Sequence, residues 1–151
     1  MRKVLVALSA ALALGASPAS AAPPAPASGT AQATSFAFTD MRTADGNTIF
    51  EGVQQGFMTG TIAGTWVEQF RLVVHADGST SFHSFLTVTG SAAGCGAGTM
   101  RFVVEGQGSG PVTEGHLGTI GSSTVDVHAE LEFTAFVATG TITYSGTYHC
   151  G

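Results

Sequence analysis

The sequence predicts an all-β protein, an antiparallel eight-stranded barrel, and three observations carry this prediction. After residue 33, stretches rich in Thr, Val, Phe and Gly alternate apolar with polar residues, the period of a strand with one buried face. None of these stretches has the spacing of an amphipathic helix. Turn residues separate about eight of them, and closing eight strands into a ring removes the two edges of an open sheet. A two-sheet β-sandwich is the alternative.

The first segment, residues 1–21, has the pattern of a secretory signal peptide. Arg2 and Lys3 precede an apolar run from Val4 to about Ala16, and small residues follow at Ala19–Ala21. The run is too short for a stable membrane anchor. We therefore expect a secreted protein that is cleaved after about Ala21.

The next segment, residues 22–33, is dominated by Pro, Ala, Ser and Gly. Such a composition buries little apolar surface, so we expect a flexible leader here. A single domain over residues 34–151 remains, long enough to build one core.

Turn chemistry divides that domain into strands, for example ADGN at 44–47 and ADGS at 76–79. The predicted strands are Thr34–Arg42, Thr48–Met58, Thr61–His75, Thr80–Thr89, Thr99–Gln107, Val112–Thr119, Thr124–Thr134 and Ala138–His149. Glycines at 52, 56, 60 and 64 recur every fourth residue. They indicate either one sharply bent strand or a break at Thr59–Gly60 followed by a hairpin.

The clearest alternation lies in Thr124–Thr134. Its apolar face is Val125, Val127, Ala129, Leu131 and Phe133, and its polar face is Asp126, His128, Glu130 and Glu132. Alternate strand residues project together, so the polar row could ligate a divalent metal. A solvated outer face is the stronger interpretation, and no metal or other cofactor is expected.

Charge excludes some classes of partner. Cleavage would remove the only lysine and leave three arginines against ten acidic residues, a net charge of −7. A surface with so little positive charge does not neutralise phosphates, which argues against nucleic acid and anionic membranes as partners.

The two cysteines, Cys95 and Cys150, are predicted to form a disulfide, because exported proteins meet an oxidising environment. The bond would close a loop of about 56 residues, worth ~4 kcal/mol in the chain-entropy model. A reactive thiol is the alternative, but no basic residue flanks Cys95 to lower its pKa.

Glu68 is the candidate catalytic residue. It shares a strand face with Trp66, Phe70 and Leu72, as the only charge among large apolar side chains. A three-residue turn with Gly78 in the left-handed conformation would place Glu68 opposite Leu86 and inside the barrel, and we prefer it to a two-residue Asp-Gly turn, which would place Glu68 opposite Thr87. Burial would raise the pKa of its carboxyl group, as a general acid or base requires. A position at the barrel mouth, or hydrogen bonds to backbone groups at a bulge, is the plainer alternative.

Three segments carry a resemblance to a known family. They are FMTGTIAGTW (57–66), HADGSTSF (75–82) and TVTGSAAGCGAGTMRFV (87–103). Together they resemble a family of small bacterial barrel proteins similar in fold to the allene oxide cyclase barrel. The resemblance covers about Phe57–Gly106 and implies a barrel of that fold. No catalytic residue of the plant cyclase matches a position of this sequence.

Three functions are compatible with these features. The first is a binding module that holds a small apolar ligand in an interior lined by Trp66, Phe70, Phe82, Phe102 and Tyr144. The second is a cyclase- or isomerase-like enzyme that uses Glu68 in a dry cavity. The third is a secreted interaction or inhibitor protein with a filled core. An empty apolar cavity would favour the first two functions.

Overall fold

The computed structural model describes residues 23–151, and the predicted signal peptide lies outside the described residues. Eight strands run consecutively through them. They are β1 (Ala25–Ala44), β2 (Asn47–Gly60), β3 (Ile62–Val74), β4 (Ser79–Ala92), β5 (Gly96–Ser109), β6 (Val112–Thr119), β7 (Val127–Phe136) and β8 (Thr141–Cys150). No helix suited to crossing a membrane occurs between residues 23 and 151.

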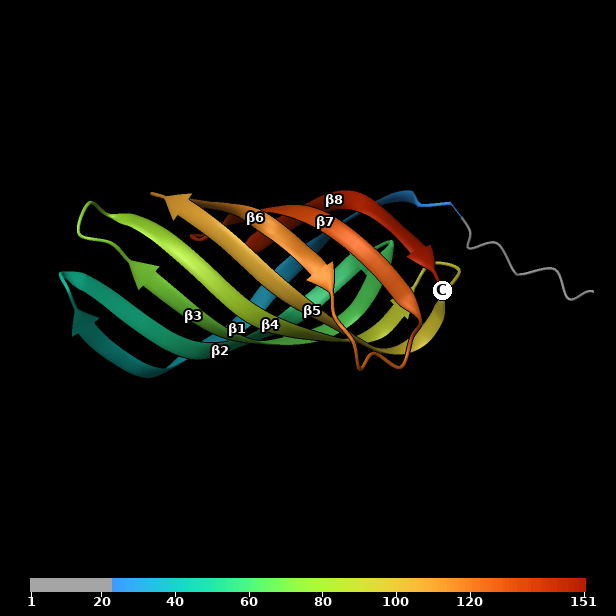
Figure 1. The fold of residues 1–151 in the computed structure, drawn as a ribbon, viewed down its shortest axis with the longest axis horizontal. Coiled ribbons are helices and arrows are strands. Elements are labelled where there is room, and N and C mark those ends of the chain that lie inside the picture. The colour runs from blue at the N-terminus through green and yellow to red at the C-terminus, as the bar shows by residue number, and fades with distance from the viewer. Residues whose placement is uncertain (1–22) are drawn as a thin grey trace, which may run out of the picture.

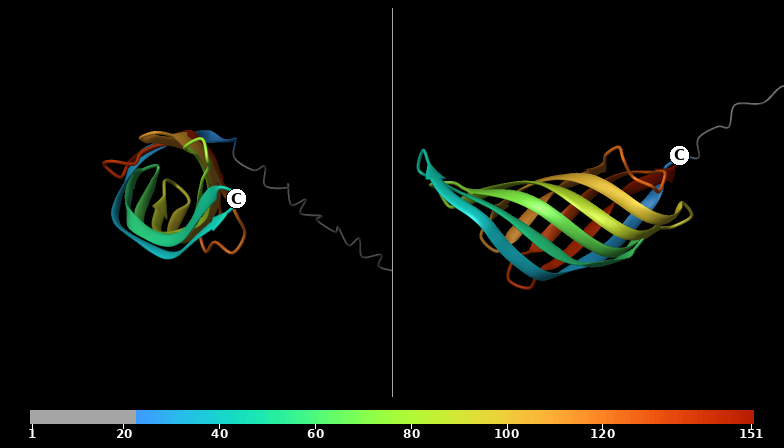
Figure 2. Two further views of the ribbon diagram at one scale, coloured as in Figure 1. Left: turned by 90° about the vertical axis from the view of Figure 1, so that its left-hand side faces the viewer. Right: turned by 90° about the horizontal axis from the view of Figure 1, so that it is seen from below.

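The strands form a closed antiparallel barrel in which each strand pairs with the next and β1 pairs with β8. The ring is visible end-on in the left view of Figure 2. The barrel prediction is therefore confirmed, and the sandwich alternative is not adopted. Because the ring is closed, the backbone of every strand has hydrogen-bonding partners on both sides over at least part of its length.

The flexible leader is the main correction to the predicted organisation. Residues 25–33 belong to β1, where Ala25–Gln32 pairs with Tyr148–Thr141 of β8. Ala27 and Ala31 are buried in the core, while Pro26, Ser28 and Thr30 are exposed. The segment thus alternates inside and outside like any other strand, with small residues on its inner face.

Ring closure is incomplete along β1. The β1–β8 ladder ends at Gln32, whereas β1 continues to Ala44 paired with β2 alone. The β1–β2 and β3–β4 hairpins consequently project at one end of the barrel, at the left of Figure 1. We call this end the hairpin end, and the end that carries Cys150 the disulfide end.

The disulfide end is filled by a packed core. Its side chains come from β1, β3, β4, β5, β7 and the segment before β7: Ala27, Ile62, Val88, Ala92, Met100, Phe102, Val125, Val127, Ala129 and Leu131. The phenol of Tyr144 ties β8 to the β2–β3 turn, since it donates to the Ile62 carbonyl at 2.8 Å and accepts from the Ile62 amide at 3.0 Å. That turn lies at Thr61, so the glycine series is broken by a hairpin and is not one bent strand.

Cys95 and Cys150 form the predicted disulfide, with sulfur atoms 1.96 Å apart. Cys95 lies in the β4–β5 turn and Cys150 is the last residue of β8, so the bond joins strands that are not neighbours in the ring. It therefore links two sides of the barrel at the disulfide end.

Removing this bond in the double variant Cys95→Ser/Cys150→Ser should lower the free energy of unfolding by about 2–5 kcal/mol. Chemical denaturation of the variant, and of the wild type with and without reductant, measures the loss. Intact mass should rise by two hydrogens on reduction of the wild type. An unchanged mass together with two free thiols would refute the disulfide.

Inward-facing aromatic residues are paired across the ladders with glycines of the neighbouring strand. Trp66 is the cross-strand partner of Gly56, and Phe70 of Gly52. The same pairing joins Phe82 to Gly106, Phe133 to Gly115 and Tyr144 to Gly29. A Cβ at Gly56 would lie 1.9 Å from the Gln32 carbonyl oxygen and 2.7 Å from Cζ2 of Trp66. Glycine thus leaves room for large rings inside a narrow barrel.

Candidate functional site

A cavity of about 700 Å³ occupies the barrel interior on the hairpin side of the packed core. Its wall includes the apolar side chains of Ala31, Met58, Leu72, Leu86, Val104, Leu117 and Ile142, and the aromatic rings of Phe36, Trp66, Phe70, Phe82, Phe133 and Tyr144. Small-molecule pockets typically measure ~300–1,000 Å³ and are lined mainly by apolar groups. The cavity therefore has the size and character of a ligand site.

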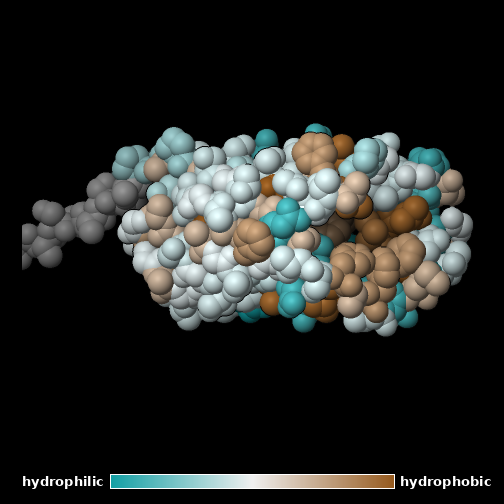
Figure 3. All heavy atoms as spheres, turned by 180° about the vertical axis from the view of Figure 1, so that it is seen from behind, coloured by the Kyte–Doolittle hydropathy of each residue, from teal (hydrophilic) through white to brown (hydrophobic). Residues whose placement is uncertain are grey.

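The cavity opens where β1 leaves the ring. Phe36 and Phe38 of β1 line it on one side, and Phe136 and Val137 at the β7–β8 turn line it on the other. These four side chains are all exposed. Figure 3 shows hydrophobic residues gathered around a hollow toward the hairpin end. A mouth rimmed by exposed aromatic and aliphatic groups suits the entry of an apolar molecule.

The hairpin register turns Glu68 into this cavity. Gly78, with φ 84°, closes the Ala76–Gly78 turn, and its amide donates to the His75 carbonyl at 2.9 Å. Glu68 then lies opposite Leu86, as the sequence predicts. Its side chain is 6% exposed and lines the cavity.

Two neutral side chains hold the Glu68 carboxyl group. The Ser84 hydroxyl donates to Oε1 from β4, and the Gln54 amide donates to Oε2 from β2. Neither donor was identified from the sequence, and within residues 23–151 no arginine forms an ion pair with Glu68. Both contacts follow from the strand register. Gln54 is the cross-strand partner of Glu68, and Ser84 is the cross-strand partner of Phe70, the next residue on the same face of β3.

Burial raises the pKa of Glu68 above its usual range, because the charged form loses its hydration. The hydrogen bonds from Ser84 and Gln54 favour the charged form and act in the opposite direction. The site thus holds a carboxyl group whose proton is retained to a higher pH than in water. That property is what proton transfer or charge pairing inside a cavity would use.

The predicted ligand-contacting aromatic residues divide into two groups. Trp66, Phe70, Phe82 and Tyr144 belong to the cavity wall. Phe102 is 1% exposed in the packed core and is not in that wall, which corrects the expectation for this residue. Its strand, β5, reaches the cavity through Val104.

The aromatic side chains of the wall form an ordered stack. Phe36 is stacked on Phe70 with centroids 4.9 Å apart, and Phe70 on Phe82 at 6.1 Å. Phe36 was not singled out from the sequence, because the end of the β1–β8 ladder that places it at the mouth is a tertiary feature. The buried indole Nε1 of Trp66 has no hydrogen-bond partner among the described residues.

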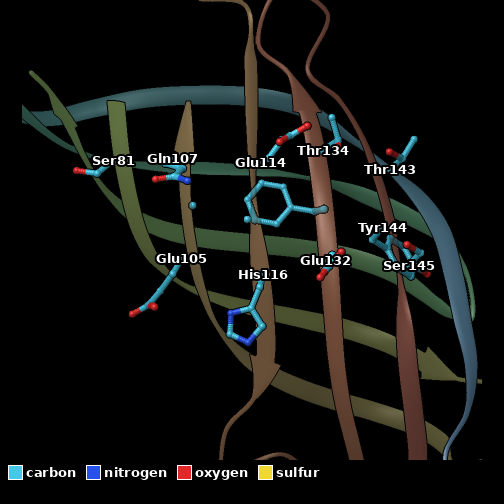
Figure 4. Close-up of a pocket in the computed structure, with 13 residues that line it drawn as sticks. Ser81, Glu105, Gln107, Glu114, His116, Glu132, Thr134, Thr143, Tyr144 and Ser145 are labelled. Atoms are coloured by element: carbon cyan, nitrogen blue, oxygen red, sulfur yellow. The ribbon is translucent and has the colours of Figure 1, made fainter. Parts of the chain in front are cut away.

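The polar row of residues 126–132, in β7 and just before it, lies on the outer surface, as expected. Asp126, His128, Glu130 and Glu132 are all exposed. Figure 4 shows His116 between Glu105 and Glu132, in a hollow on the outer face of the barrel. No group of three or more His, Cys, Asp or Glu side chains within residues 23–151 is placed to hold a metal ion.

No protein-family model matches the sequence, and no curated protein does so either. The fold and the cavity define the class of molecule: a disulfide-linked eight-stranded β-barrel with an apolar interior site around one buried carboxyl group.

Proposed function

We propose that this protein is a binding module that holds a small apolar ligand inside the barrel. The single observation that carries the proposal is the cavity of about 700 Å³, which has a mouth to solvent and a wall of stacked aromatic rings. A barrel of eight strands can be filled by side chains alone. In this chain, side chains fill the barrel only at the disulfide end. Toward the hairpin end, glycines lie beneath the aromatic rings and leave space in the interior.

We further propose that the protein acts outside the cell, as its signal-peptide pattern implies. The Cys95–Cys150 disulfide supports this location, because such bonds persist in oxidising compartments. The relationship to the allene oxide cyclase-like barrels stays a proposal from the sequence resemblance over about Phe57–Gly106, and a closed eight-stranded fold is compatible with it.

Blocking the cavity tests the proposed function. Nile red, an uncharged probe whose fluorescence rises in apolar surroundings, should bind the wild type and quench the emission of Trp66, the only tryptophan. Ala33→Phe places a ring in the cavity wall and should weaken probe binding about tenfold or more, since it removes volume that the probe occupies.

The matched control is Gln69→Phe, which adds the same ring to an exposed position of β3 and should leave binding unchanged. Native mass spectrometry of the secreted protein should also reveal a retained small molecule. Equal binding by both variants, with no retained ligand, would contradict the proposal and favour the interaction or inhibitor function.

A second candidate is a cyclase- or isomerase-like enzyme, favoured by one observation. Glu68 is buried in the cavity wall with a raised pKa, and a general acid or base in a dry site has this property. The candidate requires conversion of a bound molecule that stops in Glu68→Gln. Product analysis of the ligand retained by each protein would decide the point.

A further inference from the structure

The cavity is built with one charge-bearing group at its wall. Among residues 23–151, Glu68 is the only acidic residue that lines it, and no Arg, Lys or His does so. No ion pair within residues 23–151 involves Glu68. Tyr144 is the other titratable lining group, and burial raises its pKa, so it stays neutral at physiological pH. The carboxyl group therefore faces the cavity without a counter-charge.

The Glu68 carboxyl group retains capacity for a ligand. A carboxylate offers about four lone-pair sites, and Ser84 and Gln54 each fill one. Both are neutral donors, so they orient the group without neutralising it. Held from two neighbouring strands, its oxygens are positioned in advance for a third donor.

The surrounding rings suit a cation that carries an apolar body. Trp66 and Phe70 flank Glu68 on the same strand face, and the Phe36–Phe70–Phe82 stack continues to the mouth. Aromatic faces attract ammonium groups, Trp most strongly. The apolar part of such a ligand would lie along the stack.

Electrostatics favours a cation over an anion at this position. The chain carries a net charge of −5, and the residues after the predicted cleavage point carry −7. An ammonium group would offset the burial of the Glu68 charge, whereas a carboxylate ligand would place two like charges together.

We propose that the cavity binds lipophilic amines, with the protonated nitrogen paired to Glu68 and the hydrocarbon part packed along the Phe36–Phe70–Phe82 stack. The proposal rests on the proposed binding function and names its ligand class. It distinguishes this site from one for fatty acids, which have the same hydrocarbon part and the opposite charge.

Three probes of equal chain length test the charge preference: octylamine, octanol and octanoate. Each is titrated against the Nile red complex of the full secreted protein at pH 7, and displacement is followed by fluorescence. Octylamine should displace the dye at a concentration about tenfold or more below that of octanol, and octanoate should be the weakest. The advantage of the amine should grow as the pH rises through the raised pKa of Glu68, because octylamine stays protonated while the carboxyl group ionises.

Two variants test whether the preference for octylamine over octanol comes from Glu68. In Glu68→Gln the advantage of octylamine over octanol should disappear, and in Glu132→Gln, which removes an exposed charge from the outer face, it should persist. Equal or tighter binding of octanol or octanoate by the wild type would overturn the amine proposal while leaving cavity binding in place. Failure of Nile red and all three probes to bind would instead contradict the binding function.

Discussion

Replacement of Gly56 by alanine should lower the free energy of unfolding by about 3 kcal/mol or more, at the upper end of overpacking effects. The added methyl group would meet the Gln32 carbonyl oxygen at 1.9 Å and the Trp66 ring at 2.7 Å. The Gln32 carbonyl belongs to the backbone of the neighbouring strand β1 and is part of the barrel wall. Relief therefore requires separation of β1 from β2 or displacement of the ring.

Gly121→Ala is the matched control, because a Cβ there meets nothing within 4 Å. Urea denaturation of both variants measures the effect, and Trp66 fluorescence reports on the ring that lies over Gly56. A Gly56→Ala midpoint equal to that of Gly121→Ala would show that the barrel wall yields at little cost. The ring-over-glycine account of the cavity would then be wrong.

The second large effect is expected from Glu68→Gln, which should raise the melting temperature at pH 8 and change it little at pH 4. Burial raises the folded-state pKa of Glu68 above its unfolded value. The wild type therefore has the full contribution of the neutral acid below the unfolded pKa, and loses it as the pH rises through the folded pKa. Glutamine keeps the shape without the charge, and the Gln54 amide can rotate to accept its N–H.

Thermal melts of the wild type, Glu68→Gln and Glu132→Gln between pH 4 and pH 8 measure this difference. Glu132→Gln removes one negative charge from the outer face and controls for net charge. A lower melting temperature of Glu68→Gln at pH 8 would mean that the bonds from Ser84 and Gln54 outweigh burial. Glu68 would then be a structural residue that stabilises the barrel in its charged form.

Local signals predict much of the barrel. The Asp77–Gly78 turn sets the β3–β4 register, and through it the inward position of Glu68. The alternation in β7 separates its buried and exposed faces correctly. In both cases turn geometry and period-2 patterning act within a few residues, which is the range over which a single sequence is informative.

The first half of β1 shows where such signals fail. Its inner face consists of Ala27, Gly29 and Ala31, which carry little hydrophobic contrast with Pro26, Ser28 and Thr30. These residues are small because Tyr144 and the core already fill the interior: a Cβ at Gly29 would lie 2.3 Å from the Tyr144 hydroxyl oxygen. A composition typical of linkers thus reflects packing against a strand far away in the chain.

The partners of Glu68 were missed for a related reason. Gln54 reaches the carboxyl group through the β2–β3 register, which depends on the turn at Thr61. The sequence alone is compatible with either one bent strand or a hairpin at that point. The mouth likewise depends on where the β1–β8 ladder ends, and no local pattern marks that point.

Closure of the ring through β1 and β8 is the one strand pairing within residues 23–151 that joins distant parts of the chain. Ala25 and Tyr148 are ladder partners 123 residues apart in the chain, while the seven other ladders join consecutive strands. The entropy of closing so long a loop delays this pairing, so the hairpins form before the ring. The cavity wall takes Ala31 from β1 and Tyr144 from β8, and it is complete only in the closed ring. Binding of the proposed ligand and closure of the ring would therefore be linked equilibria: a ligand at 100 times its Kd would stabilise the closed barrel by about 2.7 kcal/mol.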